Sequence, residues 1–361
     1  MSEPITSVDA LSAAPVQPSS TRHIVEFTGD AAEFFRIWIV NILLSIVTLG
    51  IYSAWAKVRT NQYLYSHTKI AGHAFRYLAN PIQILKGRLI AVAIFALIAV
   101  LNHFNPLVSL GVSLLMLFAF PWLLLQSLRF KMRMTSYRNV RFGFHGSYGG
   151  FLKYFIGLPV LSVFTMYLLM PYALKRMDEY VYNNVSYGGR RSTLSLEAGT
   201  YYSTAFKIIG MSFAIVIAMV IAVMITAVVG SMMGEIASQV LSFIVAGAFY
   251  IGLAVISRAM WTCVIRNYTY NNLKVEQLAT FESNMEVISY SKLLFTNTLL
   301  VAFTLGLAYP WALIRLQQYR ASCTTVLLSE EIERLTDPLQ QDSSAFAEEA
   351  SDLYDVDFAL T

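Results

Sequence analysis

Two long stretches without charge constrain the fold of this chain more than any other feature. No Asp, Glu, Lys or Arg occurs between Leu89 and Leu128, and only Glu235 occurs between Ile208 and Ser257. The hydrocarbon core of a bilayer is about 30 Å thick and needs roughly 20 apolar helical residues. Each stretch can therefore hold two membrane spans and a short turn. A hydrophobic content of 56% also indicates an integral membrane protein.

An internal repeat adds a second constraint. When the chain is shifted by 256 positions, Asn41, Thr48, Leu49 and Gly50 meet identical residues, and so do Trp55, Arg59 and Tyr63. A shift of 117 positions aligns Thr48 and Arg59 with Thr165 and Arg176, and places Tyr172 opposite Trp55. Repeats of this kind set the architecture, so the fold must accommodate three copies of one element.

Each copy of the repeated element predicts two helices separated by a break. In the first copy, Asp30 is a suitable N-cap for a helix over residues 31–47, and Gly50 interrupts that helix. Gly306 is the corresponding break in the third copy, and Pro171 and Pro310 mark the start of the second helix. A first helix of about 17 residues is marginal as a span. We expect the break to expose backbone groups that other parts of the protein must shield.

Short polar segments rich in aromatic and β-branched residues follow several of the expected helices. They lie at residues 68–77, 137–142, 182–187 and 270–275. This composition predicts short strands that face water. We expect β elements on the membrane surface, and the sequence leaves open whether they pair into one sheet.

The distribution of basic residues favours one side of the membrane for all these segments. Residues 57–88 and 129–153 each contain six Lys or Arg and no acid, whereas the links at 102–106 and 230–238 contain no Lys or Arg. Basic segments stay preferentially in the cytoplasm. We therefore predict an α-helical polytopic membrane protein with four full spans, at residues 82–101, 107–128, 208–229 and 239–257. Three re-entrant or interfacial hairpins accompany them, at residues 31–66, 148–183 and 287–320; the alternative is seven full spans.

The predicted organisation has five parts. They are a disordered N-terminal tail (1–21), a first repeat unit with a hairpin, a β segment and two spans (22–143), a second repeat unit (144–280), a partial third repeat (281–328) and an acidic, disordered C-terminal tail (329–361). We expect both termini to lie in the cytoplasm.

The repeat also provides the candidate site residues. Arg59, Arg176 and Arg315 share one repeat position, where they could contact an anion or a lipid headgroup near a helix N-terminus. The alternative is that they are ordinary cytoplasmic anchors. Interfacial aromatic residues are expected four positions earlier, and glycine helix breaks are expected before them. These residues are Trp55, Tyr172 and Trp311, and Gly50 and Gly306.

No pattern in the sequence points to catalysis, a cofactor or a metal. The motifs of serine hydrolases, of phosphate-binding loops and of dinucleotide-binding loops do not occur, and the five histidines lack ligand spacing. We therefore expect no catalytic, cofactor-binding or metal site. The expected partners are the bilayer and its anionic phospholipid headgroups rather than nucleic acid. A homo-oligomer and a protein partner are left open.

Several motifs resemble the YjgN family of bacterial inner-membrane proteins, whose function is unknown. They are Phe27-Thr-Gly29, residues 34–41, residues 48–59 and residues 72–77. The likeness extends over about residues 22–325, and its most specific part is Trp55-Ala-Lys-Val-Arg59. Ala54 stands where the family usually has proline. The resemblance implies a bacterial inner membrane and provides no substrate and no functional residues.

Two functions from different classes fit these observations. The first is a non-enzymatic transporter or channel-like protein in which repeated hairpins surround a central path. The alternative is a membrane scaffold that organises anionic lipid through a cytoplasmic β platform. A membrane enzyme ranks last, because no nucleophile–base or metal constellation is present.

Overall fold

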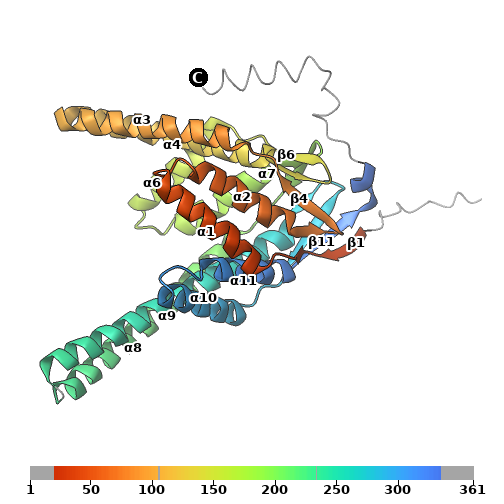
Figure 1. Cartoon of the computed structure of the whole chain (residues 1–361). Coiled ribbons are helices and arrows are strands. Elements are labelled where there is room, and N and C mark those ends of the chain that lie inside the picture. Colours follow the sequence, from red (N-terminus) through yellow and green to blue (C-terminus); the bar gives the residue numbers. More distant parts are fainter. Residues whose placement is uncertain (1–19, 105, 233, 335–361) are drawn as a thin grey trace, which may run out of the picture.

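The computed structural model describes residues 20–104, 106–232 and 234–334, and it places a ring of helical hairpins on one end of a closed sheet (Figure 1). The strands are β1 (Ser20–Ile24), β2 (Glu26–Phe27), β3 (Thr68–Ile70), β4 (His73–Tyr77), β5 (Thr135–Tyr137), β6 (Val140–Phe144), β7 (Val185–Tyr187), β8 (Arg190–Thr193), β9 (Lys274–Val275), β10 (Ala279–Ser283) and β11 (Thr324–Ser329). The helices are α1 (Ala31–Val47), α2 (Ser53–Ser66), α3 (Pro81–Phe104), α4 (Pro106–Arg133), α5 (Tyr148–Phe151), the π-helical η1 (Leu152–Gly157), α6 (Leu158–Phe164), α7 (Met170–Asn183), α8 (Ala198–Ser231), α9 (Glu235–Asn272), α10 (Val287–Phe303), α11 (Tyr309–Ser322) and the 3₁₀ helix η2 (Glu330–Arg334).

All eleven strands belong to one antiparallel sheet, in the order β1-β11-β10-β9-β8-β7-β6-β5-β4-β3-β2. The two ends of this order, β1 and β2, are separated in the chain only by Val25. The Val25 N–H donates to the carbonyl of Thr324 at 2.9 Å, so the pairing with β11 continues to that point. One segment therefore pairs with both ends of the sheet and closes it into a barrel, which leaves no open edge.

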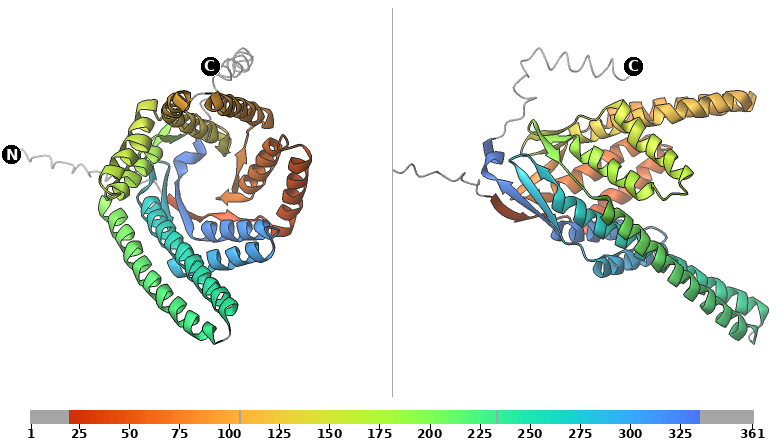
Figure 2. Two further views of the ribbon diagram at one scale, coloured as in Figure 1. Left: turned by 90° about the vertical axis from the view of Figure 1, so that its left-hand side faces the viewer. Right: turned by 180° about the vertical axis from the view of Figure 1, so that it is seen from behind.

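The chain passes five times through the same sequence of elements: strand, helical hairpin, strand. Four tight turns join one unit to the next. Each turn contains residues with positive φ: Gly72 (+75°), Asn139 (+65°), Gly189 (+80°) and Gln277 (+58°). Such turns match the twist of antiparallel strands. Because each unit starts and ends in the sheet, all five hairpins extend from the same side of it, as the ring in Figure 2 shows.

The hairpins have two lengths. Those of units two and four, α3/α4 and α8/α9, project far beyond the other three (Figure 2). Among the described residues, four helical segments are long and apolar enough to cross a membrane: Pro81–Leu101, Leu110–Arg133, Ala198–Gly230 and Glu235–Asn272. The four predicted spans fall on these helices.

The observed α8 and α9 are longer than the predicted spans 208–229 and 239–257. The additional turns lie at the sheet end, where Tyr201 and Ile265 are buried in a cluster with Leu194, Leu196 and Leu273. These turns contain polar residues, so the hydropathy of the sequence does not place them in the predicted spans. They are helical because they pack against the segments that lead into the sheet.

The turns of the three short hairpins are hydrogen-bonded within themselves. In the first hairpin, every backbone N–H from residue 48 to residue 54 donates to an oxygen of the same hairpin. The Thr48 hydroxyl takes part twice, because it donates to the Leu44 carbonyl at 2.7 Å and accepts from the Tyr52 N–H at 2.9 Å. Thr165 and Thr304 hold the other two turns in the same way.

The prediction that these breaks expose backbone groups is therefore wrong for the N–H groups of the first hairpin. The turns expose apolar side chains instead, since Leu49 and Leu305 are each 95% accessible. Gly50 and Gly306 have φ near +90° and +93°, where glycine avoids the strain of a side chain. The second hairpin has Tyr167 at φ +63° in this place, so glycine is not required in every copy.

A tyrosine hydroxyl fixes the strand-to-helix corner of each short hairpin. The Tyr63 hydroxyl accepts from the Asp30 N–H at 2.9 Å and lies 3.0 Å from the Asp30 carbonyl. Tyr180 makes both contacts with Ser147, and Tyr319 makes both with Glu286. This contact explains why the sequence repeat includes a tyrosine four residues after each candidate arginine.

The predicted β segments do pair into one sheet, but two of them were placed too early. Tyr182 and Tyr270 lie in the last turns of α7 and α9, and the strands begin at Val185 and Lys274. The predicted tails lie outside the described residues except at their inner ends. There, Ser20 begins β1, and Ile332 of η2 is buried.

Candidate functional site

A central cavity of about 500 Å³ lies between the barrel and the inner ends of the hairpins. Strands contribute its apolar wall on the sheet side, and the C-terminal turns of α2, α4, α9 and α11 contribute most of its polar groups. Its lining residues are Val25, Phe27, Tyr65, Thr68, Ile70, Phe75, Lys131, Arg266, Tyr270, Phe281, Gln317, Arg320, Ala321, Thr324 and Val326. Segments as far apart in the chain as Val25 and Val326 therefore meet at one site.

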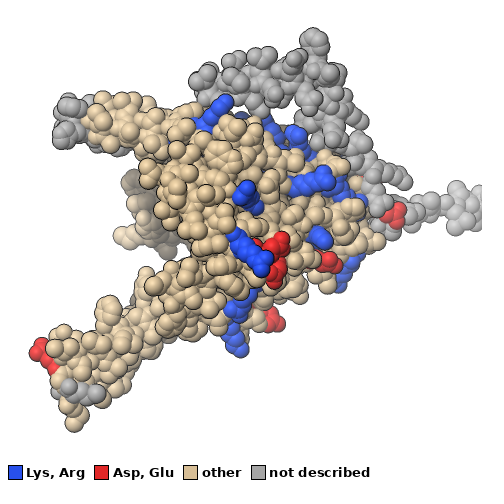
Figure 3. All heavy atoms as spheres, in the orientation of Figure 1, with Lys and Arg blue, Asp and Glu red and all other residues tan. Residues whose placement is uncertain are grey.

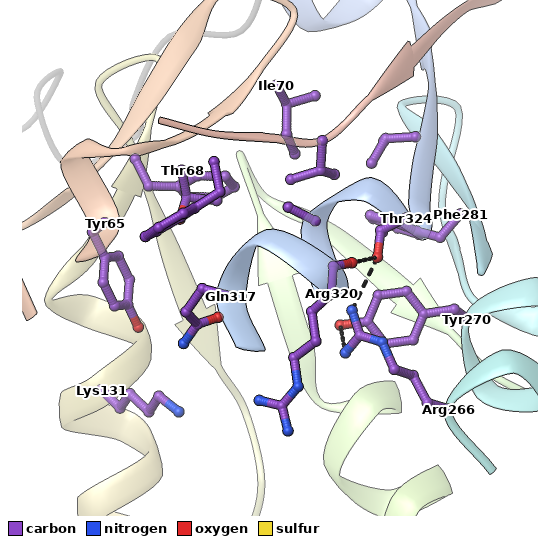
Figure 4. A pocket seen from close by; sticks show the side chains of 15 residues that line it. Tyr65, Thr68, Ile70, Lys131, Arg266, Tyr270, Phe281, Gln317, Arg320 and Thr324 are labelled. Atoms are coloured by element: carbon purple, nitrogen blue, oxygen red, sulfur yellow. Dashed lines mark hydrogen bonds between the residues drawn. The ribbon is translucent and has the colours of Figure 1, made fainter. Parts of the chain in front are cut away.

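Three cations from three different helices line the cavity, and no Asp or Glu is among its fifteen lining residues. Lys131 lies in the last turn of α4 and Arg320 in the last turn of α11. Figure 4 shows Lys131, Gln317 and Arg320 extending toward the same open region. Helix C-termini carry a partial negative charge, so basic residues are stabilised there. The closed ring collects several such termini around one axis.

Arg266 is held by neutral groups. One terminal nitrogen donates to Thr324 Oγ1 at 3.0 Å and the other to the Tyr270 hydroxyl at 3.3 Å. Its guanidinium carbon also lies 4.2 Å from the centre of the Tyr270 ring (Figure 4), which is a favourable cation–π distance. The Arg266 Nε is buried and bonds to no group in the described part of the chain. The guanidinium is thus oriented without being neutralised.

Arg320 has a similar environment. A terminal nitrogen donates to the hydroxyl of Tyr290 at 3.2 Å, and that tyrosine is almost completely buried. The Arg320 Nε is also buried and unbonded within residues 20–104, 106–232 and 234–334. Neither arginine forms one of the ion pairs found in these ranges. The cavity therefore carries a concentrated positive charge.

The barrel itself is filled by side chains and closes the cavity on the sheet side. Tyr137, Tyr187, Leu278 and Val326 are buried together in its core. The Tyr137 hydroxyl donates to the Ile70 carbonyl at 2.8 Å, and the Tyr187 hydroxyl donates to the Tyr137 carbonyl at 2.9 Å. Burial raises the pKa of the Tyr137 hydroxyl, so it stays protonated and remains a donor. A path from the cavity must therefore run between hairpins.

The three candidate arginines found through the repeat do not line this cavity. Arg59 lies in a shallow groove with Arg36, Ile37 and Val40 on the first hairpin. Arg176 and Arg315 are engaged within their own hairpins. Arg176 donates to Glu179 and to the Tyr172 hydroxyl, both at 3.1 Å, and Arg315 donates to Asn297 at 3.1 Å. Equivalent repeat positions thus have different environments.

The predicted interfacial aromatic residues also differ in their contacts. Trp55 stacks on Tyr52, with ring centres 6.1 Å apart. Trp311 packs 4.9 Å from Phe35 of the first hairpin, and so joins the last hairpin to the first. Tyr172 lies beneath the Arg176 guanidinium, at 5.6 Å.

Lys131, Arg266 and Arg320 are not among the predicted site residues, because those candidates are residues that recur between copies of the repeat. These three do not occupy one repeat position, and they meet only when the sheet closes. A weaker signal was present. Lys131 and Arg320 each lie four residues before the start of a strand, and Arg266 lies eight residues before one, as expected for residues at the inner end of a hairpin.

Comparison with known proteins places the chain in a family without a known activity. Residues 22–353 match the family described as bacterial protein of unknown function (DUF898). The chain is 34% identical over 145 residues to inner membrane protein YjgN of Escherichia coli K12, and 31% identical over 151 residues to inner membrane protein YjgN of Salmonella typhimurium. These matches cover 40% and 41% of this chain, and 36% and 38% of the relatives. No solved structure matches the chain. The family match extends over most of the sequence, and the resemblance to YjgN proteins is confirmed: the chain belongs to the DUF898 family.

Proposed function

We propose that the chain is a non-enzymatic inner-membrane protein of the transporter or channel-like class, and that its central cavity receives the solute. The observation that carries this proposal is the cavity itself, which four different hairpins and the sheet line together. Solute sites in transporters commonly lie between repeated elements, where broken helices contribute polar groups. The names of the YjgN relatives support the inner-membrane location.

We also propose that the sheet and both ends of the described chain lie in the cytoplasm. Figure 3 shows one face of the molecule, on which the Lys and Arg side chains gather toward the sheet. On the same face, the projecting parts of the long hairpins show no Lys or Arg. This is the distribution expected for a cytoplasmic sheet and membrane-embedded hairpins. If a hairpin crossed the membrane only once, the strands before and after it would lie on opposite sides of the bilayer. They belong to the same sheet, so each hairpin must return to the side on which it started.

In this arrangement the three short hairpins enter the membrane and return. At 1.5 Å per residue, α1 and α10 are each about 25 Å long, whereas α8 is about 51 Å long. The short hairpins therefore end inside the bilayer when the long ones cross it. A turn in lipid must satisfy its own backbone groups, and the threonine-supported turn at residues 48–54 does so for all its N–H groups while presenting apolar side chains.

Solute permeation through proteoliposomes tests the function. Purified full-length protein would be reconstituted, and swelling would be followed by light scattering after the addition of glycerol, potassium glutamate or potassium phosphate. We expect at least one solute to enter faster than in protein-free liposomes. Gln317→Trp, which fills the cavity, should slow that entry.

Gln318→Trp is the matched control, because Gln318 is the next residue of α11, is exposed and lies outside the cavity lining. Equal swelling with and without protein for all three solutes would count against the transport function. Equal slowing by both tryptophan variants would remove the cavity from the pathway.

Cysteine labelling tests the sidedness separately. Cys263 and Cys323 would be replaced, and single cysteines introduced at Gly72 and at Gly189. We expect neither site to react with an impermeant maleimide until the cells are opened. If the cysteine of the Gly189→Cys variant alone reacted in intact cells, the proposed arrangement would be overturned.

A further inference from the structure

We propose that the central cavity is a binding site for a phosphate-class oxyanion, held by Arg266, Arg320 and Lys131. This inference deepens the proposed function and uses the same cavity, but binding can be measured without transport. The class of ligand follows from the charge and the hydrogen-bonding capacity of the lining.

The charge of the cavity is not balanced by any carboxylate among its described lining residues. The three cations lie on α4, α9 and α11, and no carboxylate within the described ranges lines the cavity with them. Two acids of α7 have partners of their own and lie outside the lining. Asp178 accepts a hydrogen bond from Tyr201 at 2.6 Å, and Glu179 accepts one from Lys175 at 2.8 Å. A guanidinium removed from water without a counter-ion is costly, and both arginines are partly buried.

The donors of the cavity suit a group with several oxygens. The Nε atoms of Arg266 and Arg320 are buried and unbonded within the described residues, and Lys131 and Gln317 add further N–H groups from two helices. Guanidinium groups bind phosphate oxygens through charged hydrogen bonds, often in pairs. A cation would be repelled from this lining, and a neutral solute would leave the arginine charges uncompensated.

The shape of the cavity allows two sources for the phosphate group. Because the barrel core closes the axis, access lies between hairpins, which a free anion could use from the cytoplasm and a phospholipid headgroup from the bilayer. Both would present the same oxygens to the arginines. The experiment therefore uses both probes.

The first arm measures binding of inorganic phosphate to the full chain in a neutral detergent, by titration calorimetry at constant ionic strength. We expect saturable binding that weakens about tenfold or more in Arg266→Gln and in Arg320→Gln, since each loses a charged hydrogen bond. Lys131→Gln should weaken it as well. Its side chain is exposed, so this variant should fold even if the arginine variants do not.

The second arm uses nanodiscs of phosphatidylcholine with and without phosphatidylglycerol, and counts retained lipids by native mass spectrometry. Retention of phosphatidylglycerol that the same three variants reduce, and that Arg190→Gln does not, identifies a headgroup as the ligand. The control for both arms is Arg190→Gln, which removes one positive charge outside the cavity lining, where Arg190 donates to Gln277.

The outcomes separate this inference from the proposed function. Binding of either probe that depends on Arg266, Arg320 and Lys131 supports the site even if no solute permeates proteoliposomes. Absence of both kinds of binding, or equal loss in Arg190→Gln, overturns the site. The three cations would then serve only to stabilise helix C-termini, while a neutral solute could still permeate.

Discussion

Asn41 and Asn297 occupy equivalent repeat positions, are both buried, and should respond oppositely to the same substitution. Asn297 Nδ2 donates to the Ala312 carbonyl at 3.0 Å, and its Oδ1 accepts from Arg315 at 3.1 Å. Asn41 is 4% exposed, and its amide nitrogen and oxygen bond to no group in the part of the chain that the structure describes. Burial of the Asn41 side chain is therefore unfavourable, whereas hydrogen bonds compensate for the burial of Asn297.

The magnitude can be worked out for replacement by leucine, which keeps the branching of asparagine at Cγ and removes its hydrogen-bonding groups. Asn297→Leu loses a neutral hydrogen bond worth about 1 kcal/mol and one to a charged group worth about 1.5–3 kcal/mol. Burial of the leucine side chain returns about 1–2 kcal/mol. We expect a net loss of about 0.5–3 kcal/mol in the free energy of unfolding. Asn41→Leu removes an unsatisfied amide that costs about 1–3 kcal/mol, so it should raise that free energy by about 1 kcal/mol or more.

The assay is equilibrium unfolding of the purified full-length variants in one detergent, followed by tryptophan fluorescence. The double variant Asn297→Leu/Arg315→Gln measures how much of the lost stability comes from the Asn297–Arg315 hydrogen bond, because the effects of substituting two contacting residues are not additive. A loss in Asn41→Leu as large as that in Asn297→Leu would refute the reasoning. It would mean that the Asn41 amide is bonded in the native protein.

Three further predictions concern other parts of the molecule. Thr304→Val should lower the free energy of unfolding in lipid nanodiscs by about 1–3 kcal/mol by leaving a turn N–H unbonded, and an effect below about 0.5 kcal/mol would indicate that water reaches the turn. Burial alone would raise the pKa of Glu179, but bonds from its lysine, backbone and arginine partners outweigh burial and hold that pKa below its ordinary value. Its contribution to stability is therefore present above about pH 4.3 and lost as the pH falls through the lowered pKa, and Glu179→Gln should remove this part of the acid sensitivity in a pH series of unfolding curves. Arg59→Gln should weaken retention of phosphatidylglycerol in low salt more than Arg176→Gln or Arg315→Gln, because the latter two guanidinium groups already have partners; equal effects in native mass spectrometry would contradict this difference.

Local features of the fold could be predicted because they depend on neighbouring residues. Helix α1 begins at Ala31 and ends at Val47, as predicted, since Asp30 accepts from the N–H groups of Ala32 and Glu33 at 2.9 Å. The four long helices could be predicted from hydropathy, because hydropathy is also a property of neighbouring residues.

Closure of the sheet could not be predicted, because it depends on segments that are distant in the chain. β1 pairs with β11 across some 300 residues, while β2, one residue further on, pairs with β3. Nothing in the residues around Val25 distinguishes these partners. The cavity was missed for the same reason, since its cations meet only after closure.

The sequence repeat comprises three hairpins, whereas the described residues form five strand–hairpin–strand units. The three recognised copies share the threonine turn and the tyrosine corner, and both are hydrogen-bonding devices of a short hairpin. A hairpin that crosses the membrane turns in water beyond the far side, so it does not require a self-satisfied turn within lipid. The long hairpins at residues 81–133 and 198–272 could therefore lose these residues while keeping their places in the sheet.

The difference in hairpin length also limits how a ligand can reach the cavity. Among the described helices, only α3/α4 and α8/α9 extend far beyond the ring, and they diverge from one another (Figure 1). In the proposed arrangement the outer part of the membrane therefore contains two separate helical pairs with lipid between them, and the inner part contains the complete ring. A phosphate group on a lipid could enter the ring laterally, whereas a free anion would need a passage from the cytoplasm. The phosphatidylglycerol arm of the binding experiment thus tests the route of entry together with the ligand.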